Sequence, residues 1–543
     1  MVWLAAILSM LVISACAGAA NQSTLPLDNE EFSPTKVSAR DCSYGGKFLS
    51  IESVDAYTVR FVLCASEPAF LQKLALPVFS ITDQEALAST GGDSAAISQK
   101  PVGSGPYILK KWTPGDSVYL EKNPNYWGIP PRLNSIVFRW AANGQMRYRS
   151  VTGHSMDIAD QPDPAEYGAI EASSELKLED RQPLNLIYIG MKSNFPPFNN
   201  ADFRRAISYG VDRKNVVLDT LPRGSQLAEQ VVPSYITPGY SRELVWLKYV
   251  TAQSNVLLVS SGYDTNTVLE LVYPQDALPG MPNAKLVAQA IQTDLAEIKV
   301  NVQIKGMPNN EFKQGVLEGK IPFYLDELDA EYADASSFYN VLFLNPVRFL
   351  GDPDGDLQAQ VRYASEEPDP QARQRYYDKA NRLLVNKSSI IPLAHNGGGL
   401  VSRNLVENVR VGPMNENFTE MSSISDNLGF MQQFEPASLW PADEENHDTW
   451  RITSLLYDRL VAYSYDSIEI EPSLADSWTA SDDLKTWTFS LRYDVKFNDG
   501  ASMDANDVVA SFAALWDAKN PAHKGRTGQF VVFKRLFGNF LNE

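Results

Sequence analysis

The sequence has little cysteine and little histidine, and this limits the metal chemistry that it can support. Its 543 residues include three Cys and four His, and the histidines lie far apart with none of the short spacings typical of metal ligands. We therefore expect neither a metal site nor a cofactor. Cys42 and Cys64 leave two alternatives open, since outside the cytoplasm they could form a disulfide or remain as free buried thiols.

Positive charge is also scarce. The chain carries 47 Lys and Arg against 66 Asp and Glu, a formal net charge of −19. A surface this acidic repels phosphate backbones, so a nucleic-acid partner is not expected. Scattered acidic residues also keep a secreted protein in solution, and the charge by itself therefore implies no particular ligand.

The chain lacks a recognisable catalytic motif. GHSMD at residues 153–157 misses the second glycine of a nucleophile elbow. DPDGD at residues 352–356 misses the Gly and Glu that a calcium-binding loop needs at its sixth and twelfth positions, where Leu357 and Tyr363 stand. Both segments are expected to be surface turns, and we expect the protein not to be an enzyme.

Long apolar runs are absent beyond the start of the chain. The first run, about 14 residues long, is shorter than the roughly 20 that a membrane span needs and fits the core of a signal peptide. It ends in ISAC at residues 13–16, which resembles a bacterial lipobox, although no Lys or Arg precedes it. We expect residues 1–16 to be a lipoprotein signal peptide, with Cys16 lipid-modified, and residues 17–41 to be a polar linker. An ordinary signal peptide is the alternative.

What the sequence does have is enough apolar residues for large cores. Hydrophobic residues make up 44% of the chain and aromatic residues 11%, and this length predicts several domains or large lobes. Apolar and polar residues alternate with a period of two over residues 50–63 and 487–497, a pattern that predicts strands with one buried face.

Other segments have the periodicity of helices. The apolar residues over 201–221, 283–298 and 369–387 recur at near-helical spacing. A strand at 267–274, the helix at 283–298 and a strand at 299–304 follow in that order, which favours an α/β lobe with a parallel strand pair.

One segment combines acidic and aromatic side chains. Residues 327–340 place Glu331 and Asp334 beside Tyr332 and Phe338. Carboxylates and ring faces together can bind a cationic group by ion pairing and stacking. The alternative is a solvated acidic loop whose aromatic residues anchor it to the core.

Several segments together resemble one family, the bacterial extracellular solute-binding proteins of family 5. This is the oligopeptide, dipeptide and nickel class, whose members are receptors for ABC importers. The segments are PVGSGPYILKKW followed by NPNYWG (101–128), PPFNNADFRRAISYGVDR (196–213), LLYDRLVAY (455–463) and PSLADSWTASDDLKTWTFSLRYDVKFNDG (472–500). The resemblance covers most of the chain after about residue 45.

The order of these segments differs from the family pattern. In the family, the segments like FEPASLWPAD (434–443), LLYDRL and the one ending in KFNDG come first, whereas here they come last. The chain therefore looks circularly permuted, with the family's last and first segments joined through about residues 419–427. A rearranged gene whose product does not fold is the alternative.

The resemblance implies an α/β fold of the two-lobed periplasmic-binding-protein type, with an extra subdomain on lobe one. Residues 42–184 and 391–543 would form lobe one, and residues 185–390 would form lobe two. Such a protein binds its ligand in the cleft between the lobes and delivers it to an ABC permease. We expect an extracytoplasmic, lipid-anchored monomer that binds a peptide or similar small solute; the alternative is a sugar, nickel complex or other non-peptide solute.

The resemblance also implies site residues. In peptide-binding members, an Asp in a segment like GWxADYxxP pairs with the terminal ammonium of the peptide, and AEYADA at residues 330–335 places Glu331 at that position. Leu328 stands where the family usually has Trp. An acidic loop that faces the cleft in the family maps to Glu445 and His447, which follow Trp440. The expected ligand-binding residues are Glu331, Tyr332, Asp334, Phe338, Trp440, Glu445 and His447.

Overall fold

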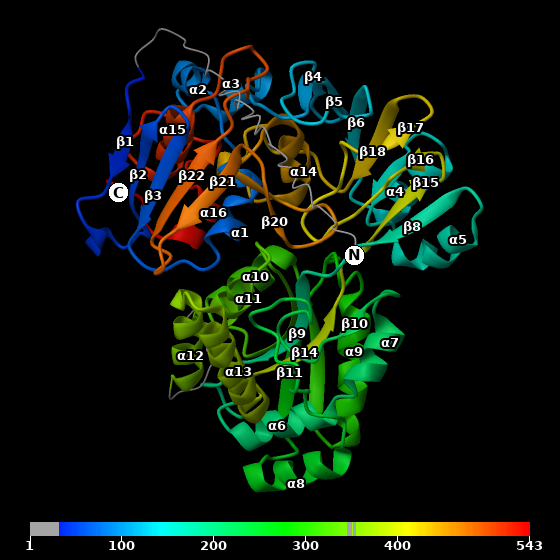
Figure 1. The fold of residues 1–543 in the computed structure, drawn as a ribbon. Helices are drawn as coiled ribbons and strands as arrows, with labels where there is room; N and C mark the ends of the chain where they lie inside the picture. The colour runs from blue at the N-terminus through cyan, green and yellow to red at the C-terminus, as the bar shows by residue number, and fades with distance from the viewer. Residues whose placement is uncertain (1–31, 345–349, 351–354) are drawn as a thin grey trace, which may run out of the picture. The chain divides into compact units, whose positions relative to one another are not determined.

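The computed structural model describes residues 32–344, 350 and 355–543, and residues Pro34–Glu543 form one compact unit (Figure 1). The expected signal peptide, the lipidation site Cys16 and most of the expected linker lie outside the described residues, as does most of the DPDGD turn. Within the described ranges, no helix is both long and apolar enough to cross a bilayer.

A six-stranded sheet contains strands from one continuous part of the chain. Its order is β10–β14–β9–β13–β11–β12, with bounds Gln226–Leu227, Ile390–His395, Asn185–Met191, Phe323–Asp329, Val268–Pro274 and Asn301–Met307. β11 pairs in parallel with β12 and β13, which confirms the predicted parallel pair. β9 is antiparallel to both of its neighbours, and all its residues are buried.

Helices cover this sheet, and several of them begin at a side-chain N-cap such as Asn200, Asp212, Asn283 or Asp369. They are α6 (Ala201–Gly210), α7 (Arg213–Thr220), α8 (Thr251–Ser261), α9 (Ala284–Glu297), α10 (Asn309–Leu317), α11 (Ala335–Tyr339), α12 (Asp356–Glu366) and α13 (Pro370–Lys387). The helical pattern over 201–221 is interrupted because Val211 is extended and the Asp212 side chain accepts from Asn215 N–H to begin α7. Ile207, Ile291 and Phe323 are fully buried in the shared core.

A seven-stranded sheet combines segments that are far apart in sequence. Its order is β4–β5–β6–β18–β7–β15–β8, with bounds Tyr107–Thr113, Ser117–Lys122, Ser135–Trp140, Asn427–Gln432, Ile158–Asp160, Gly399–Arg403 and Leu176–Asp180. β18 lies between β6 and β7 and is parallel to both. The nearby helices α4 (Gly144–Thr152) and α5 (Tyr167–Ala172) pack on its strands.

A five-stranded sheet joins the two ends of the described chain. Its order is β1–β2–β3–β22–β21, with bounds Lys36–Ser38, Phe48–Asp55, Thr58–Leu63, Thr486–Leu491 and Ala475–Ala480. β22 pairs with β3, and Trp487, Phe489 and Leu491 are buried as the alternation predicts. The predicted strand ends at Leu491 rather than at residue 497, and Tyr493 is exposed.

Helices complete this region around a cluster of aromatic rings. They are α1 (Phe70–Leu74), α2 (Gln84–Thr90), α3 (Ser94–Gln99), α15 (Ala505–Trp516) and α16 (Val531–Phe537), whereas α14 (His447–Leu456) packs in the core of the seven-stranded sheet. The Phe48 ring of β2 lies 4.6 Å from the Phe537 ring of α16. The backbone N–H of Lys47 donates to the Phe537 carbonyl at 2.7 Å, so the two ends of the described chain pack together.

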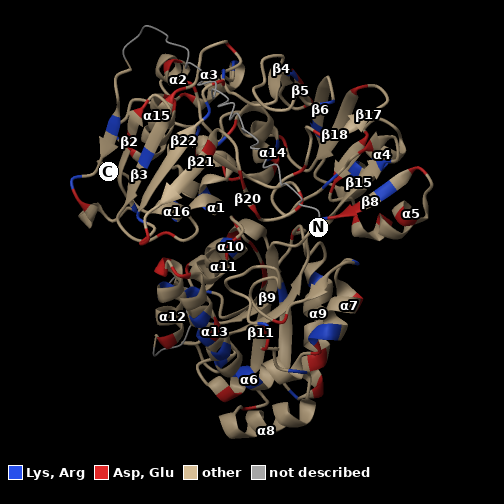
Figure 2. Ribbon diagram, viewed as in Figure 1, with Lys and Arg blue, Asp and Glu red and all other residues tan. Residues whose placement is uncertain are grey.

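Cys42 and Cys64 form a disulfide, which decides between the two alternatives that the sequence leaves open. The bond ties the segment before β2 to the end of β3. Charged residues of both signs are spread over the helices and strands, so the net negative charge is not confined to one element (Figure 2).

Candidate functional site

Two adjoining cavities lie where the six-stranded sheet meets the loops around α14. The first, here named the central cavity, has a volume of about 270 Å³. Asn185 begins β9, Asp329 ends β13 and Asn396 follows β14, and all three line this cavity. The residues facing them include Asp160, Gln161, Arg181, Gln433, Glu445, Asn446, His447, Asp448 and Arg451. Its wall is therefore rich in charged and amide side chains.

The second, here named the side cavity, has a volume of about 230 Å³. It shares Arg181, Pro413, Met414, His447 and Arg451 with the central cavity. Aromatic side chains make up much of the rest of its wall; they are Tyr126, Trp127, Phe418, Trp450, Tyr463 and Tyr465. The two cavities therefore adjoin one another, and the side cavity has the more aromatic wall.

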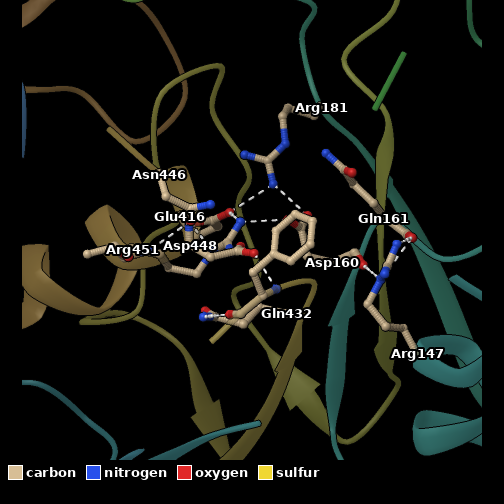
Figure 3. Close-up of polar contacts among 11 residues, drawn as sticks. Arg147, Asp160, Gln161, Arg181, Glu416, Gln432, Asn446, Asp448 and Arg451 are labelled. Atoms are coloured by element: carbon tan, nitrogen blue, oxygen red, sulfur yellow. Dashed lines mark hydrogen bonds and ion pairs between the residues drawn. The ribbon is translucent and has the colours of Figure 1, made fainter. Parts of the chain in front are cut away.

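A cluster of buried ion pairs forms the boundary between the two cavities (Figure 3). Arg451 of α14 donates to Asp160 at 2.6 Å and to Glu416 at 3.2 Å, and it also contacts Asp448. Arg181 donates to Asp160 at 2.9 Å and to Glu416 at 2.8 Å. Each guanidinium is therefore held by at least two carboxylates.

The arginines keep the central carboxylates ionised. Burial alone would raise the pKa of Asp160 and of Glu416, but the adjacent Arg451 and Arg181 lower both pKa values below their ordinary range. Asp448 differs, because burial outweighs its contact with Arg451 and raises its pKa. The cluster consequently presents fixed charges to the cavity instead of neutral carboxyl groups.

Glu445 and His447 of the expected site line the central cavity, and their role in ligand binding stays a prediction. Between them, the Asn446 side chain accepts from the N–H groups of Asp448 and Thr449 and begins α14 there. His447 also lines the side cavity, where its ring lies 5.3 Å from that of Trp450. The N-cap at Asn446 fixes the backbone from which the Glu445 and His447 side chains project.

Glu331 lies next to the central cavity, but its carboxylate forms an ion pair with another residue of the chain. Its neighbour Ala330 is part of the cavity lining. The Glu331 carboxylate accepts from Nε of Arg535 at 2.9 Å and from a terminal nitrogen of the same guanidinium at 2.6 Å. Arg535, on α16, is also 3.5 Å from Glu445. This ion pair joins the loop after β13 to α16.

The other four expected residues lie in packed interior positions and are not among the residues lining either cavity. Asp334 forms two hydrogen bonds with Arg373 of α13, at 2.8 and 2.6 Å, and caps α11. Tyr332 and Phe338 are buried, and the Trp440 ring packs edge-on against Phe530 at 6.3 Å. For the segment at 327–340, the aromatic residues thus anchor the loop to the core.

Sequence reasoning missed the arginines of the site. Arg181 and Arg451 belong to no motif, and their partners Asp160 and Glu416 come from distant segments of the chain. Arg459, which also lines the side cavity, lies within the LLYDRL segment that signalled the family. The sequence placed this segment among those that resemble the family, but it gave no sign that Arg459 lines a cavity.

A group of acidic residues lies apart from the cavities. Among the described residues, Asp83, Glu85 and Asp507 are close enough together to hold an ion. Asp507 accepts from the N–H groups of Gln84 and Asp504, and burial raises its pKa to about 8. The bonds of Asp507 link the starts of α2 and α15, a structural role that needs no ion.

Comparison with known proteins identifies the family. The sequence profile described as "Bacterial extracellular solute-binding proteins, family 5 Middle" matches residues 21–347 and 469–533. The chain belongs to this family. This family 5 protein is also 26% identical over 381 residues to di/tripeptide-binding protein 1 of Pseudomonas aeruginosa, a match that covers 68% of this chain and 71% of the relative.

Solved structures show the same fold. HbpA2 from Haemophilus parasuis matches with a TM-score of 0.62 and 24% identity, over 69% of this chain and 76% of that chain. A dipeptide-binding protein from Pseudoalteromonas sp. SM9913, solved in complex with Met-Leu, matches with a TM-score of 0.59 and 23% identity over the same shares. This family 5 protein therefore has the two-lobed α/β fold of periplasmic binding proteins.

Proposed function

We propose that this protein captures short peptides in the central and side cavities and delivers them to an ABC permease. The observation that carries the proposal is the paired cavity, in which a wall of charged and amide groups adjoins a wall of aromatic rings. The di/tripeptide-binding relative supports the same ligand class. The wall offers donors and acceptors for a peptide backbone and rings for its side chains, and we propose binding without turnover.

The two cavities fit a ligand of this size and charge. Their volumes of about 270 and 230 Å³ adjoin one another, so an extended peptide of a few residues can occupy both. A peptide brings one ammonium and one carboxylate group, and desolvating either without a partner costs several kcal/mol. Acids such as Asp329 and Glu445 supply negative charge at the central cavity for the ammonium end.

We further propose Glu331 as the acid that pairs with the ligand ammonium. Its backbone adjoins the cavity at Ala330, and its carboxylate already binds one cationic group, the Arg535 guanidinium. Arg535 has Glu445 as a second partner at 3.5 Å, so the Glu331 carboxylate can exchange the guanidinium for the ligand without leaving Arg535 unpaired. Tyr332, Asp334, Phe338 and Trp440 then act by holding this loop and its surroundings in place.

The test of ligand class is native mass spectrometry of the purified protein. Denaturation of the same sample would release any ligand that co-purifies and allow its identification. We expect a ladder of short peptides on a compactly folded protein. A single non-peptide mass would contradict the peptide proposal and leave solute binding intact, and hydrolysis of added peptides would contradict binding without turnover.

The test of Glu331 is its replacement by alanine. Glu331→Ala should weaken the binding of an amine-bearing peptide by about 2–5 kcal/mol, measured by isothermal titration calorimetry. Glu318→Ala is the matched control, because Glu318 is an exposed glutamate that pairs with Lys320. Equal affinity in wild type and Glu331→Ala would show that Glu331 has no role in ligand binding.

We propose that the protein acts outside the cytoplasm as a monomer anchored by a lipid on Cys16. The lipobox-like tetrad at residues 13–16 and the disulfide Cys42–Cys64, a bond typical of oxidising compartments, support this location. Cys16→Ser should release the protein from membranes in cell fractionation and abolish incorporation of labelled palmitate. Membrane retention of this variant would contradict the lipid anchor.

We also propose that the chain is a circular permutant of the family order. The family match in two separate segments supports this, as does the contact between Lys47 and Phe537, which brings the new ends together. A chain opened between Ile424 and Ser425, with Glu543 linked to Pro34, should fold with the same circular dichroism and ligand affinity, since Ile424 is 90% exposed. Failure of the reordered chain to fold would contradict the proposal.

A further inference from the structure

Arg459 is held at the wall of the side cavity by its backbone. It lies between α14 and β19 (Val461–Tyr463), and its carbonyl accepts from Leu474 N–H at 3.0 Å. Its side chain is only partly exposed. The rings of Tyr126, Trp127 and Tyr465 line the same cavity. The backbone of Arg459 is therefore held in place, and its side chain shares the wall of this cavity with aromatic rings.

The guanidinium of Arg459 has few partners. Among the described residues, no carboxylate lies within 4.0 Å of its nitrogens, and its one side-chain hydrogen bond is to the Ser454 hydroxyl at 3.2 Å. Its Nε is buried with no hydrogen-bond partner. Burial lowers the pKa of Arg459 below its ordinary value, although Asp458 acts in the opposite direction. A buried donor left unpaired is costly, so this arrangement favours an acceptor from outside the chain.

The other charges around the side cavity are already matched or turned to solvent. Arg181 and Arg451 are both held by Glu416, as described above. The Asp458 carboxylate accepts from Trp127 Nε1 at 2.8 Å and from Ser104 Oγ at 3.0 Å. Glu471 also lines the cavity but is exposed. Arg459 is thus the cationic group of this wall without a carboxylate at contact distance.

We propose that Arg459 is the centre of a carboxylate-binding subsite in the side cavity. A guanidinium presents parallel N–H donors that match the two oxygens of a carboxylate, and the surrounding rings exclude water that would weaken the pair. The carboxylate is an Asp or Glu side chain of the ligand or its C-terminal group. This inference rests on the proposed function in one respect, namely that the ligand is a peptide. The presence of a carboxylate on the ligand is inferred from Arg459 and does not depend on the proposed function.

The experiment uses four tripeptides that differ in one carboxylate at a time: Ala-Glu-Ala, Ala-Gln-Ala and the C-terminal amide of each. Their affinities are measured by calorimetry on wild type, Arg459→Gln and Arg459→Lys. Arg410→Gln is the matched control, because Arg410 forms exposed ion pairs with Glu420 and Asp466. Thermal unfolding of each variant shows that it is folded.

We expect wild type and Arg410→Gln to lose at least tenfold in affinity when the recognised carboxylate is removed. A loss on changing Glu to Gln identifies the acidic side chain, and a loss on amidation identifies the C-terminal group. Arg459→Gln should bind the peptides in each matched pair equally, and Arg459→Lys should retain part of the difference, since an ammonium keeps the charge without the fork of donors.

Two outcomes separate this inference from the proposed function. If the peptides bind and Arg459→Gln retains the wild-type preference among them, or wild type has none, the subsite is overturned while peptide binding stands. If none of the peptides binds wild type but glutarate, a simple dicarboxylate, binds it and not Arg459→Gln, the subsite stands and the peptide proposal fails. Absence of binding by both peptides and glutarate would overturn both.

Discussion

Arg451 lies within α14 and Arg459 lies in the loop that follows this helix, yet the two arginines have opposite surroundings. Arg451 is bracketed by Asp160, Glu416 and Asp448. Arg459 has the Ser454 hydroxyl and an unpaired Nε. Both line the side cavity.

The difference separates an arginine that holds the fold from one that is available to a ligand. A guanidinium shared among three carboxylates has most of its donors in use, and moving it would leave those carboxylates buried with fewer partners. A guanidinium without a carboxylate can take one from the ligand at little cost to the fold. The following predictions test this contrast in order of expected effect.

The largest effect is expected from Arg451→Met. The substitution removes a cation that Asp160, Glu416 and Asp448 share. Removing one partner of a buried ion pair lowers the unfolding free energy by about 3–5 kcal/mol. Urea denaturation measures the loss. The same substitution at the exposed Arg410 should cost less than about 1 kcal/mol, and equal losses at both positions would refute the structural role of Arg451.

Asp458→Asn should change the pH dependence of stability beside Arg459. Burial raises the pKa of Asp458 to about 6. The protonated carboxyl therefore contributes its full stability to the fold below about pH 4, and this contribution is lost as the pH rises through about 6. Asn is neutral throughout and keeps an acceptor for Trp127. From pH 4 to pH 7 the variant should gain on the order of 1–3 kcal/mol relative to wild type.

Urea denaturation across this pH range measures the effect of Asp458→Asn, with Asp482→Asn on an exposed turn as the control. The control should follow the wild-type curve. A constant difference between Asp458→Asn and wild type from pH 4 to pH 7 would mean that the buried carboxyl titrates as it does in the unfolded chain.

Arg459→Met should leave the unfolding free energy within about 1 kcal/mol of wild type. The substitution removes one hydrogen bond to Ser454 but also removes an incompletely paired charge, and the two effects oppose each other. Thermal and urea unfolding check this. A loss of several kcal/mol would show that Arg459 is structural like Arg451, and the contrast between them would disappear.

The smallest effect is expected from Arg535→Gln. This residue pairs with Glu331, but 42% of its side chain is exposed, and such pairs contribute less than about 1 kcal/mol. The contribution of this ion pair to the unfolding free energy should be smaller still in high salt, because exposed charges are screened. Unfolding in low and high NaCl measures both points; a large, salt-independent loss would indicate a buried structural pair.

Local pattern predicted individual strands and helices and one α/β lobe, whereas the two-lobed arrangement was implied by the family resemblance. Alternation at Trp487–Leu491 predicted β22 because one face of that strand packs on a core. The pattern continues beyond the strand because Val495 and Phe497 are also buried, now in a turn that leaves Tyr493 exposed. Periodicity reports burial, and it cannot distinguish a strand from an irregular segment that buries every second residue.

The site was predictable only in part. Glu445 and His447 could be named because they follow a recognisable segment, and both line the central cavity, but their binding of a ligand stays a prediction. The pairing of Arg451 with Asp160 spans 291 positions, and no local pattern reports such a contact. Phe338 was expected at the site because aromatic rings can stack on cations, but rings next to acids serve equally well as anchors in the core.

The pairing of β3 with β22 has a consequence for how the chain is made. Phe61 faces Trp487 across this sheet, so the early strands cannot be completed until the ribosome has passed residue 491. At about 5–20 residues per second, that partner arrives about 20 to 90 s after β3. During this interval β3 has an open edge and the chain cannot close its first sheet. The six-stranded sheet does not have to wait, because all its strands lie within residues 185–395, so the two regions are completed at different stages of synthesis.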